Sequence, residues 1–189
     1  MRYFIELSYN GKAYHGWQNQ PNDTSVQEVI ENALTKLLKE NIAIVGAGRT
    51  DTGVHAKQMF AHFDTEATFN KEKLVFKLNS FLPKDVNIHD IFKCFSKSNT
   101  DVKTYHCVIM KAFWFIENDE LHFTIKADRF LRNMVRAIVG TMINIGMGKM
   151  DVSELHNIIK SKDRSEAGYS VPAHALYLVE VEYPEDIRI

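Results

Sequence analysis

A glycine-rich stretch at residues 46–58 constrains the fold of this chain more than any other feature. Apolar runs at residues 42–45 and 59–63 flank it, which predicts a loop that joins two strands. Its three glycines within eight residues allow backbone angles that other residues avoid. Between them lie a cation and a carboxylate two positions apart, Arg49 and Asp51. We therefore expect a loop, fixed at both ends, that holds the Asp51 carboxylate in a defined direction.

Composition alone favours a plain structural role for this loop. An Asp in a glycine-rich loop most often accepts backbone N–H bonds in a local turn, and an Arg two residues away is most often solvated. The longer pattern is more specific. Residues 48–56 read GRTDTGVHA, which resembles the signature G-R-T-D-x-G-V-H-A of the TruA-type tRNA pseudouridine synthases. Nine residues with one free position rarely match by chance.

Four further segments resemble the same family. Residues 11–20 match its G-x-x-Y-x-G-W-Q-x-Q segment, which implies a place beside the active cleft. Residues 78–86 resemble L-N-x-x-L-P-x-D-I, and residues 130–140 resemble F-L-x-x-M-V-R-x-I-V-G. Residues 171–178 resemble A-P-x-x-G-L-x-L, with Ala175 in the place of the glycine. The resemblance therefore extends over nearly the whole chain.

Beyond residue 93 the chain departs from the family. Family members continue through a strand carrying R-x-Y-x-Y, two helices and a G-x-H-D-F-x-x-F segment, whereas here Cys94 is followed directly by Phe95 and a later part of the pattern. In the family, the R-x-Y-x-Y strand supplies a tyrosine that stacks on the target base. Tyr105 lies in a part that aligns with a later strand, so no residue takes that role. We expect the loss of neighbouring strands to open a sheet edge.

The resemblance implies a fold, a reaction and partners. The fold is an α+β pseudouridine synthase fold, with two similar halves at residues 1–92 and 93–189 around a central cleft. The reaction is isomerisation of uridine to pseudouridine in the anticodon stem-loop of tRNA, at positions 38, 39 and 40, without a metal or redox cofactor. The protein is expected to be a homodimer.

Three side chains are the candidate site residues. Asp51 corresponds to the catalytic aspartate of the family, and attack at C6 of the base and attack at C1′ of the ribose both stay open. Arg49 matches the motif arginine, which is implied to contact a backbone phosphate and to help flip the nucleotide. Arg136 lies among apolar residues and therefore needs an anion or several acceptors. We expect it to pair with Asp51 and to keep that carboxylate ionised although partly desolvated.

Hydrophobic patterns predict the remaining elements. Strands are expected at residues 1–9, 86–92, 101–115, 121–127 and 175–183, and helices at residues 24–38, 71–79, 128–145 and 151–160. Thr24 and Gln27 have the spacing of a capping box at the first helix, and Asp128 is expected to cap the third. This order of strands and helices indicates an α+β sandwich, with helices on one face of a mainly antiparallel sheet.

Charge is balanced overall but concentrated locally. The net charge of −1 counts against a protein that coats nucleic acid non-specifically. Between residues 126 and 149, however, five basic side chains stand against Asp128 alone. Arg129, Arg132 and Arg136 are spaced to share one face of the expected helix, and we expect Arg129 and Arg132 to be solvated.

Composition narrows the class of protein. A chain of 189 residues with 45% apolar residues can form one sizeable domain or two small ones. No apolar run is long enough for a membrane span, and the N-terminus lacks the features of a signal peptide, so we expect a cytoplasmic protein. Cys94 and Cys107 are expected to be reduced thiols, and the eight histidines lack metal-ligand spacing.

Two other functional classes stay open at this stage. The missing segment allows a catalytically weak or inactive RNA-binding remnant of the same fold. A general metabolite-binding α+β domain is the third class, and it predicts no measurable affinity for tRNA. Binding and turnover of tRNA therefore separate all three.

Overall fold

The computed structural model describes residues 1–93, 106–161, 163, 166–184 and 187. The chain forms two compact units: unit 1 comprises Met1–Asn99 and Ala173–Ile189, and unit 2 comprises Thr100–Pro172. The two halves expected from the sequence, residues 1–92 and 93–189, place the C-terminal segment (Ala173–Ile189) in the second half. In the structure that segment belongs to unit 1, because a short strand within it pairs with the sheet there.

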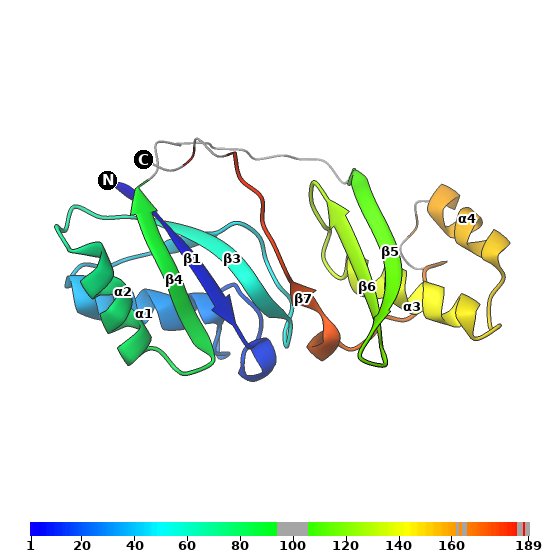
Figure 1. Cartoon of the computed structure of the whole chain (residues 1–189), viewed down its shortest axis with the longest axis horizontal. Coiled ribbons are helices and arrows are strands. Elements are labelled where there is room, and N and C mark those ends of the chain that lie inside the picture. The colour runs from blue at the N-terminus through cyan, green and yellow to red at the C-terminus, as the bar shows by residue number, and fades with distance from the viewer. Residues whose placement is uncertain (94–105, 162, 164–165, 185–186, 188–189) are drawn as a thin grey trace. The chain divides into compact units, whose positions relative to one another are not determined.

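Unit 1 is built on a sheet with the strand order β2-β3-β1-β4 (Figure 1). These strands are β1 (Arg2–Tyr9), β2 (Ile44–Gly46), β3 (His55–Asp64) and β4 (Val86–Lys93). All of their pairings are antiparallel. The short strand β7 (Tyr177–Leu178) joins β3 in parallel. With the helices described below, this confirms the expected α+β class.

Each face of this sheet has its own apolar layer. Figure 1 shows α1 (Val26–Leu38) and α2 (Lys71–Phe81) on one face. Their buried side chains pack with those of β1, β3 and β4 in the larger core, which includes Ile5, Leu7, Ile30, Leu34, Met59, Phe63, Leu74, Leu78 and Ile88. A smaller cluster of Phe4, Phe60 and Phe92 packs against Val181 and Ile187 of the C-terminal segment.

The N-cap of the first helix lies one residue after the expected one. Ser25, not Thr24, is the N-cap, and its hydroxyl accepts the Glu28 N–H at 3.1 Å. Gln27 takes no part in a capping box with Thr24, because its side-chain amide donates to the Ile44 carbonyl at 3.0 Å and to Glu31 at 2.9 Å. The expected box was therefore wrong, and Gln27 instead links α1 to β2.

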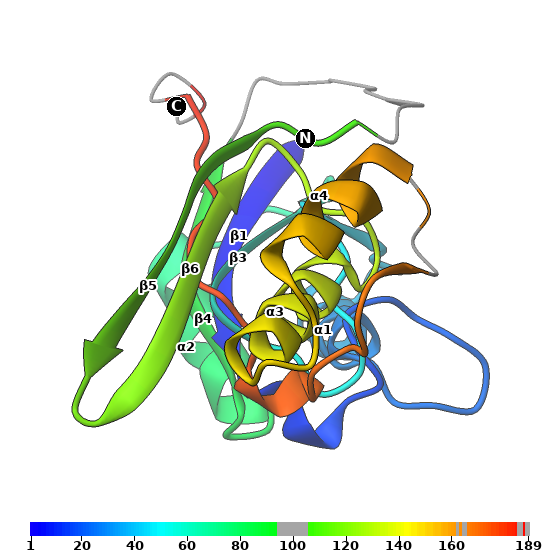
Figure 2. The same cartoon turned by 90° about the vertical axis from the view of Figure 1, so that its right-hand side faces the viewer.

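Unit 2 consists of a hairpin and two helices, which lie to one side of it (Figure 2). Strands β5 (Ile109–Glu117) and β6 (Glu120–Ala127) pair antiparallel, and α3 (Met134–Gly146) and α4 (Val152–Ser161) follow. Among the described residues, β5 pairs with β6 alone. Tyr105 and Cys94 lie outside the described residues, and Cys107 is a reduced thiol.

The third helix begins at Met134, so the expected start and cap at Asp128 were wrong. The Asp128 carboxylate instead accepts the Val108 N–H at 2.7 Å, which ties the end of β6 to the start of β5. Asn133 directly precedes the helix and has a φ of 62°. This left-handed conformation is not helical, so the helix cannot continue back through Asn133 to Asp128.

Two other sequence predictions fail for related reasons. Arg129 and Arg132 precede α3, so they do not share a helical face with Arg136. The strand expected at residues 175–183 is reduced to the two residues of β7, and its expected start lies in the 3-10 turn Ala173–Ala175.

Candidate active site

The glycine-rich stretch is a loop between β2 and β3, as its flanking apolar runs predict. At its start, the Ala47 N–H donates to the Phe60 carbonyl at 2.8 Å. Near its end, the Val54 N–H donates to the Asp51 carbonyl at 3.1 Å and closes a turn. The segment from Ala47 to Val54, termed the catalytic loop below, is thus bonded to β3 at its start and closes a turn of its own just before β3 begins.

A second segment, residues 9–17, holds the catalytic loop in its middle. The Trp17 N–H donates to the Thr50 carbonyl at 3.2 Å, and the Gly53 N–H donates to the Tyr14 carbonyl at 3.2 Å. Gly16 has a φ of 88°, and a Cβ there would lie 2.4 Å from the Thr50 oxygen. Only glycine therefore allows this approach. The resemblance implies that residues 11–20 lie beside the active cleft, and in the structure this segment contacts the loop that carries Asp51.

The Tyr9 side chain fixes the residue directly before Asp51. Its hydroxyl and the Thr50 hydroxyl are 2.8 Å apart, although the two residues are 41 positions apart in sequence. Burial raises the pKa of Tyr9 to about 12, so the phenol stays protonated at physiological pH. Alternation in the sequence assigns Tyr9 to the first strand but does not reveal its hydrogen bond to Thr50. The only sequence signal for this bond is general, because a buried tyrosine hydroxyl usually has a polar partner.

His55, the last residue but one of the motif, connects β3 with the turn after β1 and with β7. Its Nδ1 accepts the Gly11 N–H at 3.2 Å, and its ring stacks on Tyr177 of β7 with centroids 4.7 Å apart. A Cβ on Gly11 would lie 1.9 Å from the Val54 oxygen, so the turn after β1 packs directly on the end of the catalytic loop. His55 therefore joins this turn and the C-terminal segment to the motif.

The predicted site residues differ in exposure and place. Asp51 is half-buried in the catalytic loop, whereas Arg49 is exposed in the same loop. Arg136 is half-buried on α3 of unit 2. The ion pair expected between Asp51 and Arg136 would join two units, and it stays a prediction.

The side chain of Arg136 is oriented by the segment that follows α4. Its Nε donates to the Val171 carbonyl at 2.7 Å, while the Val171 N–H donates to the Arg136 carbonyl at 3.2 Å. The same segment packs closely on the helix at Gly140, where a Cβ would lie 1.8 Å from the Tyr169 oxygen. The orientation of the Arg136 guanidinium is therefore fixed by its hydrogen bond to the Val171 backbone.

No metal or membrane feature appears in the described parts of the chain. Among those residues, no three His, Cys, Asp or Glu side chains are placed to hold a metal ion. None of the described helices combines the length and apolar character needed to cross a membrane.

Comparison with known proteins identifies related sequences. A family model described as tRNA pseudouridine synthase matches residues 7–94 and 88–184. The tRNA pseudouridine synthase A of Parabacteroides distasonis is 42% identical over 247 positions, covering 98% of this chain and 97% of the relative. The proteins of the same name from Bacteroides fragilis and Porphyromonas gingivalis are 39% and 38% identical, each covering 98% of both chains.

The alignments are longer than the chain. The alignment with the Parabacteroides distasonis protein has 247 positions, and 247 minus 189 leaves at least 58 of them without a residue here. The absence of several dozen residues, expected from the sequence after residue 93, agrees with this difference.

Proposed function

This chain belongs to the tRNA pseudouridine synthase family, and on that premise we propose that it isomerises uridine to pseudouridine in tRNA with Asp51 as its nucleophile. One observation carries the proposal most directly. The family motif forms a loop that is bonded at both ends and in the middle, and Asp51 lies half-buried within it. A nucleophile held this way starts close to its reactive geometry.

The reaction needs a carboxylate and an extruded base. The bond from C1′ to N1 breaks, a bond from C1′ to C5 forms, and the proton on C5 passes to solvent while N1 gains one. Product and substrate are isomers, so no electron acceptor or donor takes part. Asp51 serves as the covalent nucleophile, at C6 or at C1′, on a nucleotide taken out of its stack.

The two arginines have separate proposed roles. Arg136 pairs with Asp51 and stabilises its ionised form, which a partly desolvated nucleophile requires. Its fixed Nε bond to Val171 supports this role, because it leaves the terminal nitrogens with a defined orientation. Arg49, exposed beside the nucleophile, contacts a backbone phosphate and assists flipping of the nucleotide.

The remaining parts of the proposal rest on the resemblance. The target uridines are those at positions 38, 39 and 40 of the anticodon stem-loop, the active form is a homodimer, and the protein acts in the cytoplasm. The first expected half, residues 1–92, carries the catalytic loop, and the second, residues 93–189, is proposed to be shorter than in the family.

Chemical mapping of pseudouridine tests the activity and its position. The purified chain is incubated with an unmodified tRNA transcript, which is then treated with carbodiimide, then with alkali, and reverse transcribed. Stops one nucleotide 3′ to positions 38, 39 or 40 are expected, and a transcript with cytidine at these positions is the matched control. If the tRNA binds without acquiring stops anywhere, the chain is an RNA-binding remnant. If the tRNA does not bind at all, the family function does not apply.

A further inference from the structure

An open groove of about 430 Å³ lies at one end of the sheet of unit 1. It is lined from β1 by Ser8, from β3 by Lys57, from β4 by His89, and from the turn before β4 by Lys84 and Asp85. Lys84 and Asp85 lie within the segment at residues 78–86 that resembles the family, whereas Ser8, Lys57 and His89 lie outside the matched segments. None of the five is among the proposed site residues, so the groove needs its own explanation.

The groove and the catalytic loop lie at the same end of this sheet. Because β1 runs antiparallel to both neighbours, its last residue, Tyr9, pairs with Ala56 at the start of β3 and with Val86 at the start of β4. The catalytic loop enters β3 at His55, one residue before Ala56. Tyr9 links the two features, since it lines the groove while its hydroxyl holds Thr50.

The charges in the groove are mainly positive. Lys57 and Lys84 are both exposed and come from different elements. The carboxylate of Asp85 accepts the Tyr14 hydroxyl at 2.7 Å, which occupies one of its oxygens. The polar side chains of Ser8 and His89 lie 2.8 Å apart along the wall. In a chain of net charge −1, this is a local basic site.

An exposed aromatic ring adjoins one of the two lysines, Lys57. The Nζ of Lys57 lies 5.6 Å from the ring centroid of Tyr177, and Tyr177 stacks on His55 of the motif. Ammonium groups beside an exposed ring suit a nucleic-acid strand, whose phosphates need cations and whose bases stack on aromatic faces. An open, shallow shape suits a strand better than an enclosed small molecule.

We propose that this groove binds RNA backbone phosphates, with Lys57 and Lys84 as the contacting cations, next to the nucleotide that Asp51 attacks. The inference rests on the proposed function, since it takes tRNA to be the substrate. It adds a phosphate site on unit 1 that is separate from Arg49 and Arg136. Each lysine that neutralises a phosphate releases counterions, so the site makes binding depend on salt.

The test is the salt dependence of tRNA binding by the full chain. Affinities of the native protein and of Lys57→Gln/Lys84→Gln are measured between 50 and 300 mM salt, a range chosen for its wide span of screening. The slope of log affinity against log salt is expected to fall by about two, or about one per lysine removed. The matched control is Lys73→Gln/Lys77→Gln, which removes two exposed lysines from α2.

The outcomes separate this inference from the proposed function. An unchanged slope in the groove variant overturns the inference, and so does an equal fall in the α2 control, which would show only a general charge effect. A native protein with no affinity for tRNA overturns the proposed function itself. Circular dichroism of both variants establishes that a lost slope does not come from unfolding.

Discussion

The hydroxyl pair of Tyr9 and Thr50 sets the position of Asp51 at the scale of single residues. Thr50 is held by this bond through its side chain and by Trp17 through its carbonyl. Asp51 follows directly, so its backbone has little freedom. A small displacement of a nucleophile lowers the rate of the chemical step more than it lowers substrate affinity.

Tyr9→Phe tests this positioning role. The substitution keeps the buried ring and removes the bond to Thr50, so we expect kcat to fall by about tenfold with KM nearly unchanged. The cost to folding is about 1 kcal/mol. Tyr3→Phe is the matched control, because among the described residues the Tyr3 hydroxyl bonds to Met1 Sδ alone, 3.5 Å away, near the opposite end of the same strand. Equal kcat values for the two variants in steady-state assays would contradict the role.

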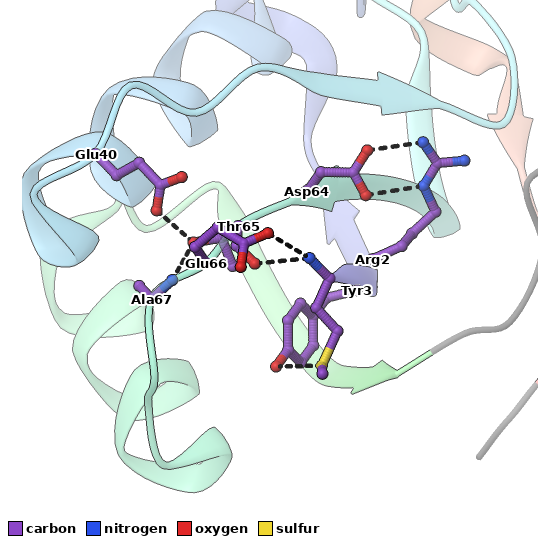
Figure 3. A network of polar contacts seen from close by, with 8 residues as sticks. Arg2, Tyr3, Glu40, Asp64, Thr65, Glu66 and Ala67 are labelled. Carbon is purple, nitrogen blue, oxygen red and sulfur yellow. Dashed lines mark hydrogen bonds and ion pairs between the residues drawn. The ribbon is translucent and has the colours of Figure 1, made fainter.

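The ion pair of Arg2 and Asp64 predicts a pH dependence of stability (Figure 3). Hydrogen bonds from the Arg2 guanidinium hold the pKa of Asp64 below its ordinary value of 3.8. The pair therefore stabilises the folded state above about pH 3.8, and this contribution is lost as the pH falls through the lowered pKa.

Asp64→Asn is expected to lower the free energy of unfolding at pH 7 by at most about 1 kcal/mol, because the carboxylate side chain is 59% exposed. Thermal unfolding measured from pH 7 down to pH 3 checks the sign. The difference in Tm between native protein and variant should shrink at the acid end. A difference that grew as the pH fell would show that the pair does not act as described.

Helix ends show, at the scale of elements, where sequence patterns are ambiguous. Thr24 and Ser25 are neighbouring residues that can both cap a helix, and Gln27 and Glu28 can both complete a box. The structure uses Ser25 because Gln27 is needed for the Ile44 carbonyl. Such a choice depends on a strand distant in sequence, which local patterns do not contain.

Alanine substitutions distinguish the two caps. Ser25→Ala removes the acceptor of the Glu28 N–H at a fully buried position, so we expect a loss of about 1 to 2 kcal/mol in urea unfolding. Thr24→Ala, at an exposed position, should change the free energy of unfolding by less than about 0.5 kcal/mol. A larger loss of unfolding free energy in Thr24→Ala than in Ser25→Ala would instead support the capping box of Thr24 and Gln27 expected from the sequence.

The strands of unit 1 were largely predictable, whereas the start of α3 and the short extent of β7 were not. Hydrophobic patterns predict β1 and β4 to within a residue or two, because successive side chains of a strand point to opposite faces of the sheet. The start of α3 depends on the left-handed conformation of Asn133, which no periodicity reveals. Asp51 was found through its motif, and the resemblance implied a place beside the cleft for residues 11–20, but the bond between Tyr9 and Thr50 is a tertiary contact that local patterns do not contain.

At the scale of the whole molecule, the two units differ in how fully they are packed. Unit 1 has buried layers on both faces of its sheet. In unit 2, every residue of β5 is exposed, and among the described residues this strand has β6 as its only partner. A long exposed edge of this kind was expected from the residues absent relative to the family.

For the chain as a whole, the sequence has no R-x-Y-x-Y pattern, which the resemblance implies as the source of the stacking tyrosine, whereas the loop of Asp51 is formed in the structure. Our account holds that Asp51, with Arg49 and Arg136, supports turnover without that tyrosine. Release of tritium from tRNA labelled at C5 of uridine measures the reaction itself, since the C5 proton must leave.

The native chain should release tritium, Asp51→Asn should release none above background, and Asp64→Asn, the same substitution at the other end of β3, should remain active. Release that persists in Asp51→Asn, or a native chain that binds tRNA and releases nothing, would contradict the account.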